Sequence, residues 1–402
     1  MSSPAGSAQL EPIRERSEIV ERHLAGASEP RWRTTSRIVA AALALGATLL
    51  ILAPIGFYRM FGFFAPWDDE GCVLITLKSF MDGQRLYDDV FSMYGPFPIL
   101  LRSLIFTVAG VPVGHDAGRL IALSYWLVAA ALCGAAAWRL TRSIVAGWAA
   151  GLFVFHGLGL LIQEPGHPQD LCAVLLGLAV FLATFIGAPG GRRPALFIMI
   201  GIVAGCLAMT KINVFVFMMM ALGAALLSFI GRTWWTAALG LLFAVGLLIA
   251  PGLLMRQLLA HPEVRSYALH VTLALVPILI LAIGRPARSM FAVRDCAWIA
   301  AGLVASIGMI AALVLLRGTT PAALLDGVAL IPLRAGVRFF GTSLAFLGHW
   351  RIPVAFIVGA LVVEPETGVL REVPVERHAE RAREIDRFRG VGEEWKGVLV
   401  DA

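Results

Sequence analysis

The chain has 402 residues, of which 58% are hydrophobic and only 15% charged, and its formal net charge is +6. Its mean hydropathy of +0.80 excludes an ordinary soluble domain, because such domains are only about half apolar and about a quarter charged. The basic residues gather at the ends of apolar runs and form no patch interleaved with aromatic residues, so nucleic acid is not an expected partner. Composition therefore predicts an all-α, polytopic membrane protein.

The chain begins with a polar segment, residues 1–37, which we expect in the cytoplasm because its arginines would be retained on that side. The apolar run 38–58 is long enough to span a hydrocarbon core of about 30 Å. The loop 59–97 then faces outward. Within it, apolar residues at helical spacing after Glu70 predict a short interfacial helix. Its N-terminus would carry acidic residues, and Gly83 would mark its C-terminus.

After this loop, the stretch 97–111 contains Arg102 and predicts a juxtamembrane helix rather than a full span. Further spans are predicted near 119–138, 144–162, 171–188, 195–209, 212–230, 233–254, 266–284 and 298–316. They give a helical membrane domain, 38–363, with about 9–11 transmembrane helices. A long outward loop follows residue 316.

The last part of the chain, 364–402, is rich in Glu and Arg and has no apolar face long enough for a domain. One interpretation is a polar cytoplasmic tail, possessing no folded structure of its own. The other is an aberrant end, truncated or frame-shifted, of a membrane domain that once continued. The sparing use of lysine, with high Ala and Gly content, suggests a GC-rich bacterial genome and hence a bacterial plasma membrane.

Three consecutive carboxylates, Asp68, Asp69 and Glu70, open the predicted interfacial helix. One carboxylate would be enough to cap a helix N-terminus and oppose its dipole. Three beside each other at a bilayer surface repel one another, which raises the pKa of at least one toward that of a useful general base. We expect a catalytic role for this cluster, with simple helix capping as the alternative.

A second acidic loop, 163–170, is predicted on the same side of the membrane and carries Glu164, His167 and Asp170. These residues could line a site shared with the first loop, keep a proline-rich turn hydrated, or bind a divalent metal ion. The spacing is a weak metal signal, and no other metal or cofactor motif is present; the five cysteines are scattered.

Lys211 is the most unusual residue within the apolar region, because ionisable groups at membrane depth are costly. It could snorkel to the outer interface, or it could bind an anionic ligand such as a phosphate. Arg119 is a weaker candidate for the same role, since arginines at span ends commonly anchor helices.

Several short motifs lie along roughly residues 38–335: Asp69-Glu70-Gly71, Phe80-Met81-Asp82-Gly83, Leu86-Tyr87-Asp88-Asp89, Tyr94-Gly95-Pro96-Phe97-Pro98, Gly110, Arg119 and Thr210-Lys211-Ile212-Asn213. Together they resemble the polytopic GT-C glycosyltransferases, and in particular bacterial proteins related to protein mannosyltransferases and aminoarabinose transferases. Many relatives have two prolines where this chain has Gly95-Pro96, and many continue with further spans or a periplasmic domain.

The resemblance implies a GT-C-like fold and an enzyme that moves a sugar, with inversion, from a polyprenyl-phosphate donor to an extracytoplasmic glycan, lipid or protein acceptor in envelope assembly. It implies that Asp69 is the catalytic base and that Glu70 or Asp68 assists. We expect substrate contacts at Lys211, Arg119, Glu164, Asp170 and Tyr94. The alternatives are a non-enzymatic transporter or flippase, whose typical internal repeats are not visible here, and a pseudo-enzyme scaffold.

Overall fold

The computed structural model describes residues 31–62, 69–161, 166–186, 193–229, 233–256, 259–284 and 292–332. Within these ranges the regular secondary structure is helical, with one isolated β-bridge and no strand. Four helices are long and apolar enough to cross a bilayer, namely Ile38–Phe61, His115–Thr141, Trp234–Leu253 and Arg294–Leu316. The chain is therefore an α-helical membrane protein, as its composition predicts.

The chain divides into two compact units, which are described separately. Unit 1 is built from residues of Met1–Lys78 and Arg102–Phe185, and unit 2 from residues of Ser79–Leu101 and Ile186–Ala402. Each unit therefore combines segments that are distant in the sequence.

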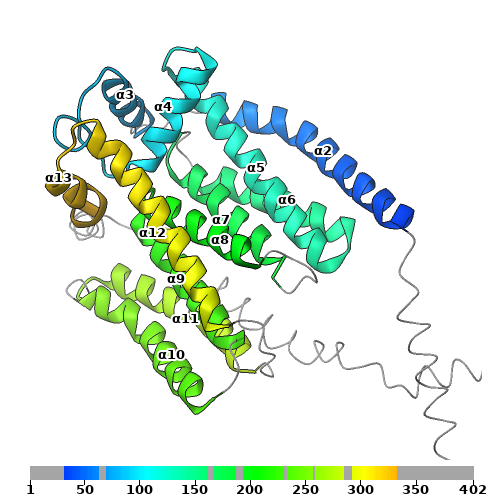
Figure 1. Cartoon of the computed structure of the whole chain (residues 1–402). Coiled ribbons are helices and arrows are strands. Elements are labelled where there is room, and N and C mark those ends of the chain that lie inside the picture. The colour runs from blue at the N-terminus through cyan, green and yellow to red at the C-terminus, as the bar shows by residue number, and fades with distance from the viewer. Residues whose placement is uncertain are drawn as a thin grey trace, which may run out of the picture. The chain divides into compact units, whose positions relative to one another are not determined.

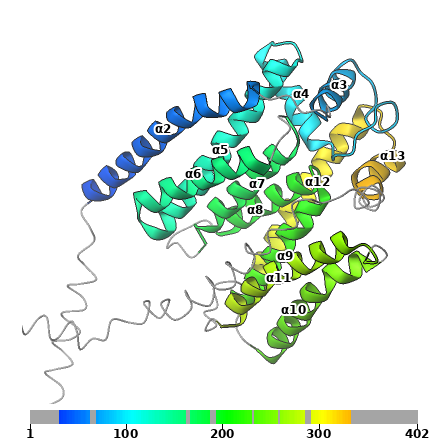
Figure 2. The ribbon, with the colours of Figure 1, turned by 180° about the vertical axis from the view of Figure 1, so that it is seen from behind.

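Unit 1 contains α2 (Arg31–Phe61), α5 (His115–Thr141), α6 (Ile144–Leu161) and α7 (Gln169–Ala183). It also contains most of α3 (Asp69–Met81) and α4 (Phe97–Ala109). Helices α2, α5 and α6 run alongside one another in both views (Figures 1 and 2).

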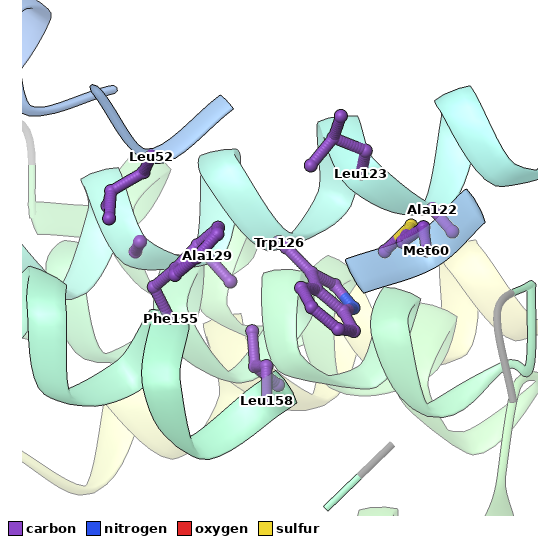
Figure 3. Packing of buried hydrophobic residues seen from close by; sticks show 9 residues of the cluster. Leu52, Met60, Ala122, Leu123, Trp126, Ala129, Phe155 and Leu158 are labelled. Atoms are coloured by element: carbon purple, nitrogen blue, oxygen red, sulfur yellow. The ribbon is translucent and has the colours of Figure 1, made fainter. Parts of the chain in front are cut away.

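The core of unit 1 is an apolar cluster contributed by α2, α5 and α6 (Figure 3). At its centre the indole of Trp126 meets the ring of Phe155 edge-on, with ring centroids 5.9 Å apart. Gly56 lets α2 approach this cluster, because a Cβ atom there would overlap the side chains of Leu123 and Phe155. Van der Waals packing of this kind holds helices together in lipid, where burial in a bilayer offers little hydrophobic gain.

Unit 2 contains α8 (Arg193–Ala208), α9 (Ile212–Phe229), α10 (Trp234–Leu254), α11 (Pro262–Gly284) and α12 (Val293–Leu316), as Figure 1 shows. Helices α8 and α12 make the most extensive contact. Glycines allow it: a Cβ on Gly201 would overlap the carbonyl oxygen of Ile299, and one on Gly302 would overlap that of Ile198.

The helices occur where the sequence predicts them. Residues 69–81 form a short helix that begins in acid, and Gly83 follows it with a φ of +97°, a value that glycine adopts without a steric penalty. The apolar stretch with Arg102 is the 13-residue α4. However, α7 and α8 have only 15 and 16 residues, fewer than the roughly 20 that cross a bilayer perpendicularly. The described residues thus contain four helices of spanning length and several shorter apolar ones, beside the 9–11 spans that the sequence predicts for the whole chain.

The prediction of a long loop after residue 316 is wrong for its first part. Residues Pro321–Leu325 form α13, and Asp326–Leu330 continue as the π-helix η2. Thr320 caps α13 by accepting a hydrogen bond from the backbone N–H of Ala323, and Pro321 occupies the first turn, where its missing N–H costs nothing. Thr320-Pro321 is a helix-start signal of purely local origin.

Candidate functional site

Glu70 and Arg119 form a buried ion pair in unit 1. The Arg119 guanidinium donates to both carboxylate oxygens of Glu70, at 2.8 Å from Nη2 to Oε2 and 3.0 Å from Nε to Oε1. Its Nη1 donates to the carbonyl oxygen of Met60 at 2.7 Å. The two charged side chains are only 3% and 8% exposed. One guanidinium therefore joins the end of α2 to the starts of α3 and α5.

His115 is a third side chain beside this pair. Its Nδ1 lies 3.2 Å from Oε1 of Glu70, and the ring is half exposed. Arg119 donates to both oxygens of Glu70 and His115 lies beside one of them, so these two side chains occupy most of the acceptor positions of this buried carboxylate. The arrangement suits Glu70 to holding the first turn of α3 in place.

A second buried cluster in unit 1 surrounds Asp170. Its Oδ1 accepts a hydrogen bond of 2.7 Å from Nε1 of Trp126, whereas its Oδ2 has no hydrogen-bond partner among the described residues. Asp170 lies in the first turn of α7, which is not one of the four long spans. Burial raises the pKa of this carboxyl group to about 7, whereas the hydrogen bond from Trp126 and the charge of Arg102 lower it.

Arg102 of α4 is itself buried, and its Nη2 donates to the carbonyl oxygen of Gly166. Burial lowers the pKa of Arg102, while its electrostatic interactions with Asp170 and Glu70 counteract that shift. A Cβ atom on Gly166 would lie 3.9 Å from Cγ of Glu70. Within unit 1, Gly166 of the second acidic loop thus lies beside Glu70, and Arg102 interacts electrostatically with the carboxylates of both Glu70 and Asp170.

In unit 2 the structure brings together two segments that the sequence analysis singled out. The backbone N–H of Gly95 donates to the carbonyl oxygen of Thr210 at 3.0 Å, and that of Phe97 to the carbonyl oxygen of Met209 at 2.9 Å. Gly95 is required for this close approach, because a Cβ atom there would overlap the carbonyl oxygen of Met209. As a result Nζ of Lys211 lies 5.7 Å from the centre of the Tyr94 ring, within the range of a cation–π contact.

Tyr87 holds the loop that carries Tyr94. Its backbone has a φ of 72°, and its hydroxyl donates to the Tyr94 carbonyl oxygen at 2.7 Å. Burial raises the pKa of this phenol. Gly327 of η2 lies so close that a Cβ atom there would overlap the Tyr87 ring.

The same loop is held by the residues that precede α13. The hydroxyl of Thr319 donates to the carbonyl oxygen of Leu86 at 3.0 Å, and Thr320 donates to the carboxylate of Asp88 through its backbone N–H at 2.8 Å. These contacts join segments more than 230 residues apart in the sequence. Sequence reasoning noted the Tyr-Asp-Asp run but offered no signal for its partners.

The predicted site residues are described to different extents. Asp68 and Glu164 lie outside the described residues, and Asp69 begins α3 but its side chain is not described. Glu70 and Arg119 lie together and Asp170 lies near them in unit 1, while Tyr94 and Lys211 lie together in unit 2. Sequence reasoning missed Trp126 and Tyr87 as partners and gave Arg102 no role.

The metal alternative gains no support from the geometry. Among the described residues, no three His, Cys, Asp or Glu side chains lie close enough together to hold a metal ion. Asp170 bonds Trp126, and Nδ1 of His167 accepts the backbone N–H of Gln169 at 3.2 Å.

Comparison of the chain with known protein families, with characterised proteins and with solved structures finds no match.

Proposed function

We propose that this protein is a membrane glycosyltransferase of the GT-C type that transfers a sugar from a polyprenyl-phosphate donor to an extracytoplasmic acceptor hydroxyl. The observation that carries the proposal is the backbone pairing of Gly95 and Phe97 with Thr210 and Met209. It joins two of the motifs on which the resemblance rests and places an aromatic ring beside the cation Lys211. An aromatic face suits the stacking of a sugar ring, and an ammonium group suits a phosphate.

The reaction assigns one task to each of two residues. The acceptor oxygen attacks the anomeric carbon as the bond from that carbon to the phosphate oxygen breaks, which inverts the configuration. Asp69 accepts the proton of the acceptor hydroxyl. Lys211 stabilises the charge that develops on the departing polyprenyl phosphate. The lipid-linked donor accounts for a site in a membrane protein whose sequence has no nucleotide-binding motif.

One expected catalytic role, that of Glu70, and two expected substrate contacts, those of Arg119 and Asp170, are reassigned on the basis of burial and contacts. Glu70 acts as a positioning residue for α3, since Arg119 occupies its carboxylate. Arg119 is committed to Glu70 and Met60 and is therefore not proposed to bind substrate. Asp170 is fully buried against Trp126, so it is proposed to anchor the second acidic loop.

The base is tested by Asp69→Asn, which keeps the size of the side chain and removes its capacity to accept a proton. Sugar transfer from a panel of polyprenyl-phosphate sugars, measured in proteoliposomes, should fall by about 10²–10⁴-fold. Asp82→Asn, at an exposed carboxylate after the same helix, is the matched control and should retain transfer. Parental turnover in Asp69→Asn would reduce this residue to a helix cap.

The phosphate role is tested by binding of geranylgeranyl phosphate, which carries a prenyl chain and a phosphate but no sugar. Lys211→Met should weaken binding by about tenfold or more, the loss expected for one charge-assisted contact, and Lys211→Arg should restore most of it. Lys78→Met removes another cation, one that is exposed on α3, and serves as the control. Unchanged binding by Lys211→Met would mean that this lysine only snorkels. Phosphate binding without transfer from any donor would favour the scaffold or transporter alternative.

A further inference from the structure

Unit 1 contains an apolar groove far from the Glu70 cluster. The groove has a volume of about 190 Å³ and lies between α2, α5 and α6. Residues that line it include Ile38, Ala42, Leu45, Trp138 and Trp148. On α5, Trp138 is 19 residues beyond Arg119, which corresponds to roughly 28 Å along the helix axis. The groove is therefore separate from the Glu70–Arg119 ion pair within unit 1.

The walls of the groove belong to the membrane region. Both α2 and α5 contain one of the four long apolar spans, and the groove lies where α5 ends at Thr141. Trp148 is 51% exposed, and tryptophan is enriched where the hydrocarbon core meets the headgroups. Thr48 brings a hydroxyl to the lining, but this hydroxyl donates to the carbonyl oxygen of Ala44 in its own helix. The lining thus offers an apolar ligand van der Waals contact.

An exposed arginine lies next to the groove lining along the chain. Arg142 is the exposed C-cap of α5, and Ile144, two residues later, lines the groove. Arg139 is already engaged, because its guanidinium stacks 3.7 Å from the centre of the Phe185 ring. Basic residues at the mouth of a groove between transmembrane helices attract anionic lipid headgroups.

We propose that this groove binds one acyl chain of an anionic phospholipid, with the phosphate of its headgroup at Arg142. The groove is smaller than the roughly 300–1,000 Å³ of sites that enclose whole small molecules, but it can accept a segment of a flexible chain. Two of its walls, α2 and α5, are long and apolar enough to span a membrane, and the exposed cation Arg142 lies two residues from the lining residue Ile144. These features match the two parts of such a lipid. The assignment does not rest on the proposed glycosyltransferase activity.

The acyl-chain contact is tested with dioleoylphosphatidylglycerol, using native mass spectrometry of the full-length protein. Ala42→Phe fills the groove from α2 and should reduce the bound fraction by about tenfold, the change expected when about two methylene groups lose their contact. Ala47→Phe is the matched control, because Ala47 is an exposed alanine of the same helix that does not line the groove. Equal retention of the lipid by the two variants overturns the proposal.

The headgroup contact is tested by comparison with dioleoylphosphatidylcholine, which has the same chains and no net charge. The parent should prefer the glycerol lipid, and Arg142→Asn should reduce this preference by about fivefold. Asparagine is the appropriate replacement because Arg142 has a φ of 58°, a conformation that asparagine tolerates. Equal binding of both lipids by the parent would contradict the proposal. A protein dimer that Ala42→Phe dissociates would also contradict it, because a second copy of the chain would then occupy the groove.

A second measurement covers the case in which Ala42→Phe fails to fold. Phosphatidylglycerol with brominated acyl chains quenches nearby tryptophan, so the parent should lose more fluorescence than Trp148→Phe does in the same vesicles. Equal quenching of the two proteins would place the acyl chain away from the groove and would overturn the proposal.

Discussion

Replacing Glu70 with alanine should destabilise unit 1 far more than the loss of an ordinary surface charge. The substitution removes both carboxylate oxygens to which Arg119 donates and leaves a guanidinium that is only 3% exposed. Breaking a buried pair by removing one partner costs about 3–5 kcal/mol, whereas an exposed pair contributes about 0–1 kcal/mol. Because Arg119 also bonds Met60, the loss should loosen the end of α2 as well as the start of α3.

Two further variants separate the charge from the packing. Glu70→Gln keeps the shape and one acceptor oxygen, so its cost should lie below that of Glu70→Ala. The double variant Glu70→Met with Arg119→Met replaces the pair by apolar side chains and should recover much of the lost stability, because no buried charge is left unpaired. Asp116→Ala removes an exposed carboxylate from the first turn of α5 and should cost less than about 1 kcal/mol.

The free energy of unfolding can be measured in mixed detergent and SDS micelles by the exposure of cysteine thiols. Cys172 is 4% exposed and becomes reactive on unfolding, whereas Cys72 is exposed and should be replaced by serine to lower the background. A cost below about 1 kcal/mol for Glu70→Ala would refute the reasoning, because the pair would then behave like one at the surface. Equal costs for Glu70→Ala and Asp116→Ala would do the same.

Two other predictions concern the loop before α4 and the second acidic loop. Gly95→Ala should force residue 95 away from Met209 and abolish the binding of geranylgeranyl phosphate. Gly157→Ala is the control and should bind normally, because a Cβ atom there meets open space. Binding by Gly95→Ala at the parental level would contradict the pairing. Burial raises the pKa of Asp170 from 3.8 to about 7, so the folded state retains a proton that the unfolded chain releases. The contribution of Asp170 protonation to the free energy of unfolding should be complete below pH 3.8. It should fall by up to about 1.4 kcal/mol per pH unit as the pH rises, and it should be lost once the pH exceeds about 7. Unfolding measured from pH 5 to 8 should show a flatter profile for Asp170→Asn than for the parent, and parallel profiles would argue against this effect.

The sequence by itself determined the class of protein and most helix positions. A hydrophobic content of 58% with few charges leaves helices as the expected way to satisfy backbone hydrogen bonds in a bilayer. Helix ends depend on local chemistry, so Gly83 could be identified as a stop from its residue type alone. The Thr320-Pro321 start of α13 was equally local and could have been predicted.

Only the tertiary structure decided which residues meet. Glu70 and Arg119 are 49 residues apart, and Thr319 and Leu86 are 233 apart. Helices that are apolar over most of their surface carry no clear amphipathic stripe, so the sequence does not tell which face of one helix contacts another. The sequence made Glu70 a candidate for the catalytic cluster, but tertiary packing makes it the partner of Arg119. Asp170 is buried against Trp126 because α5 and α7 lie side by side.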